Sequence, residues 1–213
     1  KKALNLQKKG DYIQAYKLYK FLIKNKFQNQ EVFINFAAVC QNINKQNDAI
    51  ILLKEAIKIN PSNSVPFFKM GFILNNNGKF YEALPFAKKA VDLNPNLWQG
   101  YHNLIKILIN LNRPKEAKSE ALNAKKLFSN NHLFDSLLGD IHSYTGDFNE
   151  AKKYYKKAIS ISPNDEVTIY TFANFSVGIG DKKESIKLFN KVLKINPLHS
   201  LSFYSLSTII DIE

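Results

Sequence analysis

Apolar residues along this chain recur three and four positions apart, which is the spacing of an amphipathic helix and not the alternation of a half-buried strand. The helical stretches come in pairs at a fixed period of 34 residues. The first helix of each period covers roughly positions 2–14 and the second roughly positions 17–31, as residues 65–78 and 80–94 illustrate. Such a period is typical of a solenoid, in which each pair buries its apolar side only against its neighbours. The pattern therefore predicts an all-α chain of stacked helix pairs.

Three sequence columns share this period, and each has a physical reason. Proline at position 32 cannot continue the second helix and presets the turn that follows it. Gly or Asn at position 15 tolerates the left-handed conformation in which the chain leaves the first helix. Alanine at positions 20 and 27 lets helices approach closely, where a larger side chain would overpack the contact at a cost of about 1–3 kcal/mol. The proline column is Pro61, Pro95, Ser129, Pro163 and Pro197. The Gly/Asn column is Gly10, Asn44, Gly78, Asn112, Gly146 and Gly180. The alanine columns are Ala15, Ala49/Ala56, Ala83/Ala90, Ala117/Ala124, Ala151/Ala158 and Ser185/Val192.

The same columns set the expected boundaries of the repeats. Complete repeats are predicted at 30–63, 64–97, 98–131, 132–165 and 166–199. Residues 1–29 are expected to form a partial N-terminal repeat, mostly its second helix, and residues 200–213 the first helix of a further repeat or a cap. The prediction is one continuous repeat domain.

Several stretches resemble the tetratricopeptide repeat. The resemblance rests on Met70-Gly71, on Leu138-Gly139 and on the segments 78–95 and 146–163. It implies a right-handed superhelical solenoid of antiparallel helix pairs, with the first helix of each pair lining a concave groove. Departures from the pattern are Asp135 in place of the aromatic residue at position 4, Ser129 in place of proline, Ser185 and Val192 in place of alanine, and Pro85 within a second helix.

The formal net charge of +12 suggests a nucleic-acid or membrane partner at first sight. However, only Arg113 among the 30 basic residues is arginine, and recognition of phosphates and base edges relies on the bidentate guanidinium. The abundance of Lys, Asn and Ile is also what an AT-rich genome would give, and the lysines collect on the second helices, as a solvated surface does. We therefore do not expect a nucleic-acid partner.

No constellation of residues indicates catalysis. The four histidines fall at four different repeat positions and never four residues apart, so we expect neither a metal site nor a cofactor. Cys40, the only cysteine, occupies a position where a small buried hydrophobe packs. A lone cysteine fits a reducing compartment, and the sequence has no signal peptide and no run of about 18 apolar residues, so a cytoplasmic location is expected.

The resemblance implies that positions 2, 5, 6, 9, 12 and 13 of each first helix face the groove. These positions are rich in amides and aromatic residues, and their net charge is close to neutral, because only Glu31, Lys69, Lys106, Asp140 and Asp211 are charged. Amide side chains can bond the main chain of an extended peptide, and aromatic rings supply apolar contacts. The candidate peptide-binding residues are Asn35, Phe68, Lys69, Phe72, Asn75, His102, Asn103, Lys106, Asp140, Tyr170, Asn174 and Tyr204.

Two groove chemistries known in the family can be compared with these positions. The clamp that holds a chaperone's C-terminal carboxylate needs Lys, Asn and Arg at set positions of three consecutive repeats, and no three repeats here supply them. An asparagine ladder at position 6, typical of repeats that feed peptide to a protein glycosyltransferase, is present only in part. Asn35 and Asn103 fit it, whereas Lys69, Leu137, Thr171 and Ser205 do not.

The sequence therefore predicts a non-catalytic scaffold or adaptor that binds a peptide or helix of a partner protein. The alternative is the substrate-recruiting region of a larger transferase, of glycosyl- or sulfotransferase type, with its catalytic domain outside these residues. The helix at 201–213 carries apolar residues on an uncapped end, namely Phe203, Leu206, Ile209 and Ile210. Because a solenoid needs a polar cap, self-association or further helix beyond Glu213 is expected.

Overall fold

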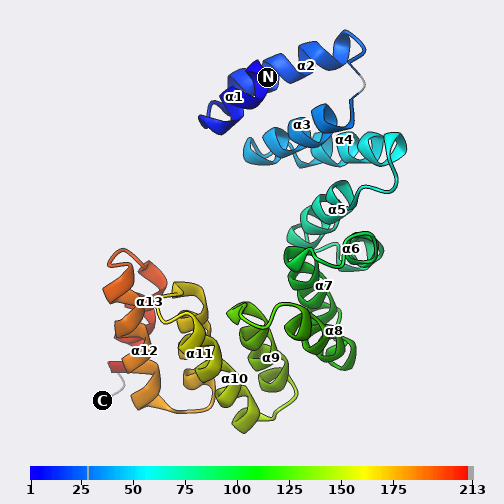
Figure 1. The fold of residues 1–213 in the computed structure, drawn as a ribbon. Helices are drawn as coiled ribbons and strands as arrows, with labels where there is room; N and C mark the ends of the chain where they lie inside the picture. Colours follow the sequence, from blue (N-terminus) through cyan, green and yellow to red (C-terminus); the bar gives the residue numbers. More distant parts are fainter. Residues whose placement is uncertain (28, 211–213) are drawn as a thin grey trace. The chain divides into compact units, whose positions relative to one another are not determined.

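The computed structural model describes residues 1–27 and 29–210 (Figure 1). These residues form thirteen helices and no strand, which confirms the all-α prediction. The helices are α1 (Lys2–Lys8), α2 (Tyr12–Lys24), α3 (Gln30–Asn42), α4 (Gln46–Ile59), α5 (Ser64–Asn76), α6 (Phe80–Leu93), α7 (Trp98–Asn110), α8 (Pro114–Leu127), α9 (His132–Tyr144), α10 (Phe148–Ile161), α11 (Glu166–Gly178), α12 (Lys182–Ile195) and α13 (Ser200–Ile210).

The chain divides into two compact units, residues 1–111 (unit 1) and residues 112–213 (unit 2). In unit 1 the helices pack as the pairs α1/α2, α3/α4 and α5/α6, and the second helix of each pair packs on the next first helix, up to α7. Unit 2 follows the same plan, with the pairs α9/α10 and α11/α12, with α8 on α9 and with α12 on α13. The packing of neighbouring helices in pairs is thus as predicted.

The turn inside each pair depends on one left-handed residue. All six residues of the Gly/Asn column have positive φ, between 56° and 80°. At Gly10, Gly78, Gly146 and Gly180 an added Cβ would meet no atom within 4 Å. The backbone conformation, and not lack of space, therefore selects the small residue at these turns.

The alanine columns lie in the buried core between the helices. All the alanines named for positions 20 and 27, from Ala49 to Ala158, are fully buried. Ser185 and Val192, which replace alanine in the last complete repeat, are fully buried as well. The Ser185 hydroxyl donates to the carbonyl of Lys182 at 2.8 Å, so its burial leaves no unpaired hydroxyl hydrogen. Helix α6 runs through Pro85 without interruption.

Asp135 stands where the family has an aromatic residue, and it is fully buried on α9. Its carboxylate pairs with the ammonium of Lys125, which also lies 4.8 Å from the centre of the Tyr154 ring. The ring of His142 stacks on Tyr154 with centroids 5.4 Å apart. A charged pair with aromatic neighbours thus stands at the position where the three preceding repeats have Phe33, Phe67 and Tyr101.

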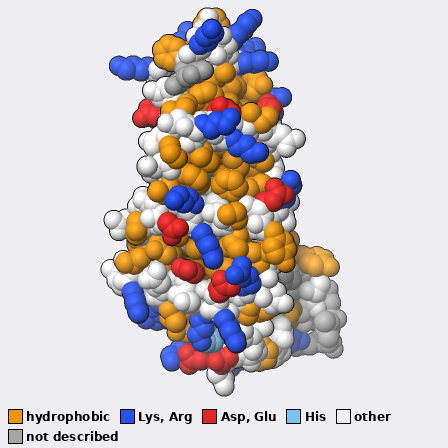
Figure 2. All heavy atoms as spheres, turned by 90° about the vertical axis from the view of Figure 1, so that its right-hand side faces the viewer, with side chains coloured by type: hydrophobic (Ala, Val, Ile, Leu, Met, Phe, Trp, Pro, Cys, Tyr) orange, Lys and Arg blue, Asp and Glu red, His pale blue; other side chains and the backbone are white. Residues whose placement is uncertain are grey.

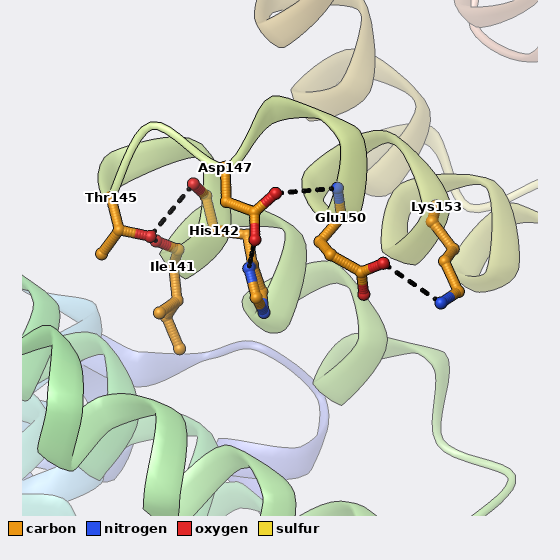
Figure 3. A network of polar contacts seen from close by, with 6 residues as sticks. All are labelled: Ile141, His142, Thr145, Asp147, Glu150 and Lys153. Atoms are coloured by element: carbon orange, nitrogen blue, oxygen red, sulfur yellow. Dashed lines mark hydrogen bonds and ion pairs between the residues drawn. The ribbon is translucent and has the colours of Figure 1, made fainter.

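The same histidine links α9 to the start of α10 (Figure 3). His142 Nδ1 lies 3.2 Å from Asp147 Oδ2, and the other carboxylate oxygen of Asp147 accepts the backbone N–H of Glu150 at 3.3 Å. Asp147 therefore caps α10 and pairs with α9 at once, which fixes the turn between the two helices.

A polar contact recurs between positions 1 and 34 of a repeat, which lie at the starts of successive first helices. Asn63 donates to Gln30 Oε1 at 2.8 Å in unit 1. In unit 2, His132 Nε2 lies 3.4 Å from Asp165 Oδ2, and His199 Nε2 lies 3.6 Å from Glu166 Oε1. Three repeats thus place a polar pair at the same register.

The last described helix, α13, is only partly covered. Leu206 is buried and Ile209 packs against the core of unit 2, whereas Phe203 and Tyr204 are exposed. The side chain of Ile210 and the positions 211–213 lie outside the described residues. Only part of the apolar surface expected on this helix is therefore open, and self-association through it stays a prediction.

Candidate functional site

The twelve candidate residues are divided between the two units. Unit 1 holds eight of them, on α3, α5 and α7, and unit 2 holds four, on α9, α11 and α13. The first group is Asn35, Phe68, Lys69, Phe72, Asn75, His102, Asn103 and Lys106, and the second is Asp140, Tyr170, Asn174 and Tyr204.

A chain of amides joins α5 to α7 in unit 1. Asn110 Nδ2 donates to Asn75 Oδ1 at 3.2 Å, and Asn75 Nδ2 donates to Asn103 Oδ1 at 3.4 Å. Asn103 is buried, and its Nδ2 has no hydrogen-bond partner among the described residues. Gly71 leaves room for this amide, because a Cβ there would lie 3.3 Å from Asn103 Nδ2. The structure therefore brings together two candidate residues and adds Asn110.

On α5 and on α7, the candidate residues include pairs three or four positions apart, which are neighbours on one helix face. The surface that these residues form together with the end of α3 is called the amide face below. It consists of Phe68, Lys69, Phe72, Asn75 and Asn76 on α5, of His102, Asn103, Lys106 and Asn110 on α7, and of Gln41 and Asn42 on α3. The rings of Phe68 and Phe72 lie 6.2 Å apart, and Phe72 is 43% exposed.

A hollow of about 370 Å³ opens between the C-terminal ends of α3 and α5. Its lining consists of Gln41, Asn42, Gln46, Phe72, Ile73 and Asn76. Four of these six side chains are amides, and none carries a charge. Asn35 lies further along α3 and lines a separate hollow of about 230 Å³ with residues of α1 and α2.

The charges of the amide face are all positive. Burial lowers the pKa of the Lys69 ammonium below its ordinary value. Burial, with a smaller contribution from the charge of Lys106, lowers the pKa of His102 to about 4. The imidazole is therefore neutral at neutral pH. Helices α5 and α7 contain no acidic residue, and no described carboxylate pairs with Lys69 or Lys106.

The candidate residues of unit 2 have different surroundings. Asp140 Oδ1 accepts the hydroxyl of Tyr155 at 2.6 Å, which ties α9 to α10. The buried ring of Tyr155 lies only 2.8 Å from the place of a Cβ on Gly139, so glycine is required there. Burial, then the charge of Asp140 and the hydrogen bond to it, raise the pKa of Tyr155 well above its ordinary value.

Of the two aromatic candidate residues in unit 2, Tyr170 packs against neighbouring rings. The ring of Tyr170 lies 4.8 Å from that of His199 and 5.9 Å from that of Phe189. Tyr204 on α13 and Asn174 on α11 are exposed. No hydrogen bond or ring contact joins Tyr170, Asn174 and Tyr204 to one another in the described part of unit 2.

The model of the tetratricopeptide repeat family matches three segments of the chain, at residues 67–97, 136–165 and 168–197. These segments are tetratricopeptide repeats. The resemblance drawn from the sequence is therefore confirmed, and the helix pairs of the tetratricopeptide repeats are those described above. Repeats of this kind form scaffolds for protein–protein interaction and are generally non-catalytic.

Solved structures of tetratricopeptide repeat proteins share the fold. TTC0263, a thermophilic protein of Thermus thermophilus, matches with a TM-score of 0.75 at 16% identity, over 85% of this chain and 99% of that one. PilF of Pseudomonas aeruginosa matches with a TM-score of 0.74 at 15% identity, over 97% and 93% of the two chains. YrrB, described as having an unusual peptide-binding site, matches with a TM-score of 0.61 at 18% identity, over 89% and 97%. No curated protein matches the sequence.

The remaining features concern metal binding, membrane insertion and thiol reactivity. Across residues 1–27 and 29–210, no three His, Cys, Asp or Glu side chains are grouped so that they could hold a metal ion. Among the described helices, none has both the length and the apolar character needed to cross a bilayer. Cys40 is buried, and burial, followed by the charge of Asp48, raises the pKa of its thiol to about 11 although Lys45 opposes this. The thiol is therefore protonated and unreactive at neutral pH.

Gln46, Ile73 and Asn110 belong to the same surroundings without being among the predicted residues. Asn110 lies at position 13 and could have been included, because the resemblance assigns that position to the groove. Gln46 begins the second helix of its pair, α4, and Ile73 lies beside the assigned positions. The place of Gln46 and Ile73 in the hollow depends on how α3 and α5 pack, which the repeat pattern alone does not specify.

Proposed function

We propose that unit 1 binds an extended peptide segment of a partner protein on the amide face. The observation that carries this proposal is the hollow of about 370 Å³, lined by four amides and the exposed ring of Phe72. Its volume lies in the range of ligand sites, about 300–1,000 Å³. An amide side chain offers both a donor and an acceptor, as an extended peptide main chain requires.

The setting of the hollow supports a peptide over a small apolar ligand. Gln41, Gln46 and Asn76 have no side-chain hydrogen bond to a described residue, so their donors and acceptors remain available. Phe72 adds an apolar contact at the edge of this polar surface, which suits a side chain of a bound peptide. Among similar structures, YrrB is described as having an unusual peptide-binding site.

Selection of short random peptides displayed on phage against the protein tests the proposal. The affinity of selected peptides is then measured by isothermal titration calorimetry. Phe72→Ala should weaken binding by about tenfold or more, because the loss of an aromatic contact in a binding interface commonly costs that much affinity. Circular dichroism confirms that the variant keeps its helices.

Tyr81→Ala is the matched control. Tyr81 lies on α6 of the same unit and is highly exposed, so its removal also deletes an aromatic surface residue from unit 1. It should leave the affinity within about twofold. Equal losses in the two variants, or selected peptides whose affinity does not depend on Phe72, would contradict binding on the amide face.

A further inference from the structure

The net charge of the protein is unevenly divided between the two units. Residues 1–111 contain sixteen lysines and six acidic residues, a formal charge of +10 with histidine neutral. Residues 112–213 contain fourteen basic and twelve acidic residues, a formal charge of +2. The two units have similar numbers of basic residues, so the difference lies in the scarcity of acidic residues in unit 1.

Two lysines of unit 1 that lie away from the amide face have acidic neighbours. On α4, Lys58 Nζ lies 2.6 Å from Glu55 Oε1, and at the start of α6, Lys79 Nζ lies 3.4 Å from Glu82 Oε1. Figure 2 shows a face on which acidic and basic side chains are interspersed among hydrophobic ones. Such an arrangement is that of an ordinary solvated surface.

The lysines of the amide face have no neighbouring carboxylate of this kind among the described residues. Lys69 and Lys106 have no carboxylate partner in the described part of the chain, and Lys69 is partly buried. His102 is neutral at neutral pH and can donate one N–H. A partly desolvated ammonium without a counter-ion is electrostatically unfavourable, and a carboxylate placed beside it relieves this. Charge complementarity of this kind decides which partner a surface accepts.

We infer that the segment bound on the amide face is acidic, with carboxylate side chains placed beside Lys69 and Lys106, an inference that rests on the function proposed above. The uncharged hollow beside Phe72 holds a neutral side chain of the same segment. Residues 1–111 contain no arginine, so the face lacks the planar fork that recognises phosphates in two contacts. The partner that fits is therefore an acidic protein segment and not a nucleic acid.

Two fluorescein-labelled peptides of equal length test this inference by fluorescence anisotropy, at about 150 mM salt to screen long-range attraction. One repeats Glu-Leu-Asn, and the other repeats Gln-Leu-Asn, so that they differ only in charge. The Glu peptide should bind at least about tenfold more tightly than the Gln peptide. Equal affinities would overturn the inference, and so would failure of both peptides to bind.

Three variants locate the effect. Lys69→Met and Lys106→Met should each weaken binding of the Glu peptide by about fivefold or more and leave the Gln peptide nearly unchanged. Lys89→Met is the control, because Lys89 is an exposed lysine of unit 1 on α6, and its removal changes the net charge equally. An equal loss with Lys89→Met would show that general charge attracts the peptide, and the assigned carboxylate positions would be wrong.

The outcomes separate this inference from the function on which it rests. If phage-selected peptides bind in a Phe72-dependent manner but carry no excess of Asp and Glu, the peptide-binding function stands and the acidic partner is excluded. If no selected peptide depends on Phe72, both proposals fail. Displacement of the Glu peptide by an oligothymidylate of similar length at lower concentration than by the unlabelled Glu peptide would instead favour a single-stranded nucleic acid.

Discussion

The two units have the same helix plan but use their charged residues differently. In unit 2, ion pairs and hydrogen bonds connect different helices. Lys125 on α8 pairs with Asp135 on α9, Tyr155 on α10 donates to Asp140 on α9, and Lys152 on α10 pairs with Asp181 at the start of α12. In unit 1, the contact between α5 and α7 is made by neutral amides, and the lysines of the amide face have no acidic partner among the described residues. Charged side chains therefore join helices in unit 2, whereas no described carboxylate pairs with the lysines on the amide face of unit 1.

The largest effect is expected from removing the counter-ion of the buried Asp135 carboxylate in unit 2. Lys125→Ala would leave that carboxylate buried without its counter-ion, which should destabilise unit 2 by about 3–5 kcal/mol. Urea unfolding with hydrogen exchange measures the loss and shows whether it is confined to residues 112–210.

Lys126→Ala is the matched control for this variant. Lys126 is the next residue on α8 and is exposed, so its loss should change stability by less than about 0.5 kcal/mol. The double variant Asp135→Phe with Lys125→Met, which restores an aromatic residue at the position, should recover most of the stability lost in Lys125→Ala. Similar effects of Lys125→Ala and Lys126→Ala would mean that the buried pair does not stabilise unit 2.

Two glycines at equivalent positions differ in how tightly their surroundings are packed in the two units. Gly71 in unit 1 and Gly139 in unit 2 occupy position 8 of their repeats, opposite position 24, which is Ala87 in one and Tyr155 in the other. An added Cβ would lie 3.2 Å from the backbone nitrogen of Ala87 but 2.8 Å from the Tyr155 ring. Because that ring is buried and hydrogen-bonded to Asp140, it cannot move away easily.

Gly139→Ala should therefore destabilise the protein by about 1–3 kcal/mol, as overpacked sites do. Gly71→Ala should cost less, because the contact is looser and alanine favours the helix by up to about 1 kcal/mol. Thermal and urea unfolding of both variants measure the difference. A larger loss in Gly71→Ala than in Gly139→Ala would show that position 24 does not decide the packing at position 8.

The repeat columns were predictable because they depend on local backbone geometry and on periodicity. The left-handed conformation of Asn44 and Asn112 and the burial of Ala83 and Ala117 follow from the residue type and its place in the period. These columns determine which residues form helices and which helices pack together. For that reason the fold could be read from the sequence with little further information.

The polar contacts were less predictable because they depend on which side chains meet across helices. The pairing of Asp135 with Lys125 requires the rotation of α8 against α9, and only an unexplained departure from the family pattern marked this position. The contacts of His132 with Asp165 and of Glu166 with His199 carried a usable signal. Each joins residues 33 positions apart, so comparison of positions 1 and 34 across repeats would have found them.

The candidate site was predictable only as a set of positions. Asn75 and Asn103 are in contact as their positions suggest, but the hollow beside Phe72 includes Gln46 from a second helix. Asp140, although predicted on the groove side, bonds Tyr155 instead of standing alone. Helical position determines the side on which a residue lies, whereas tertiary packing determines whether its polar atoms are available.

Titration of His102 tests the unusual electrostatics of unit 1 directly. Burial, and to a lesser extent Lys106, lower its pKa in the folded protein to about 4, below the ordinary value of 6.5. As the pH falls below about 6.5, the unfolded chain binds a proton at this histidine and the folded chain does not, so the free energy of unfolding decreases until the pH reaches about 4.

Replacing this histidine should remove that dependence. Between pH 7 and pH 5, wild-type protein should lose about 1–2 kcal/mol more stability than His102→Gln. Lys106→Gln should reduce the wild-type loss only slightly, because burial is the larger cause of the low pKa. Urea unfolding at the two pH values measures these differences. Identical losses in wild type and His102→Gln would mean that the imidazole is accessible to protons in the folded state, and the electrostatic contrast between the amide face and unit 2 would then rest on the lysines alone.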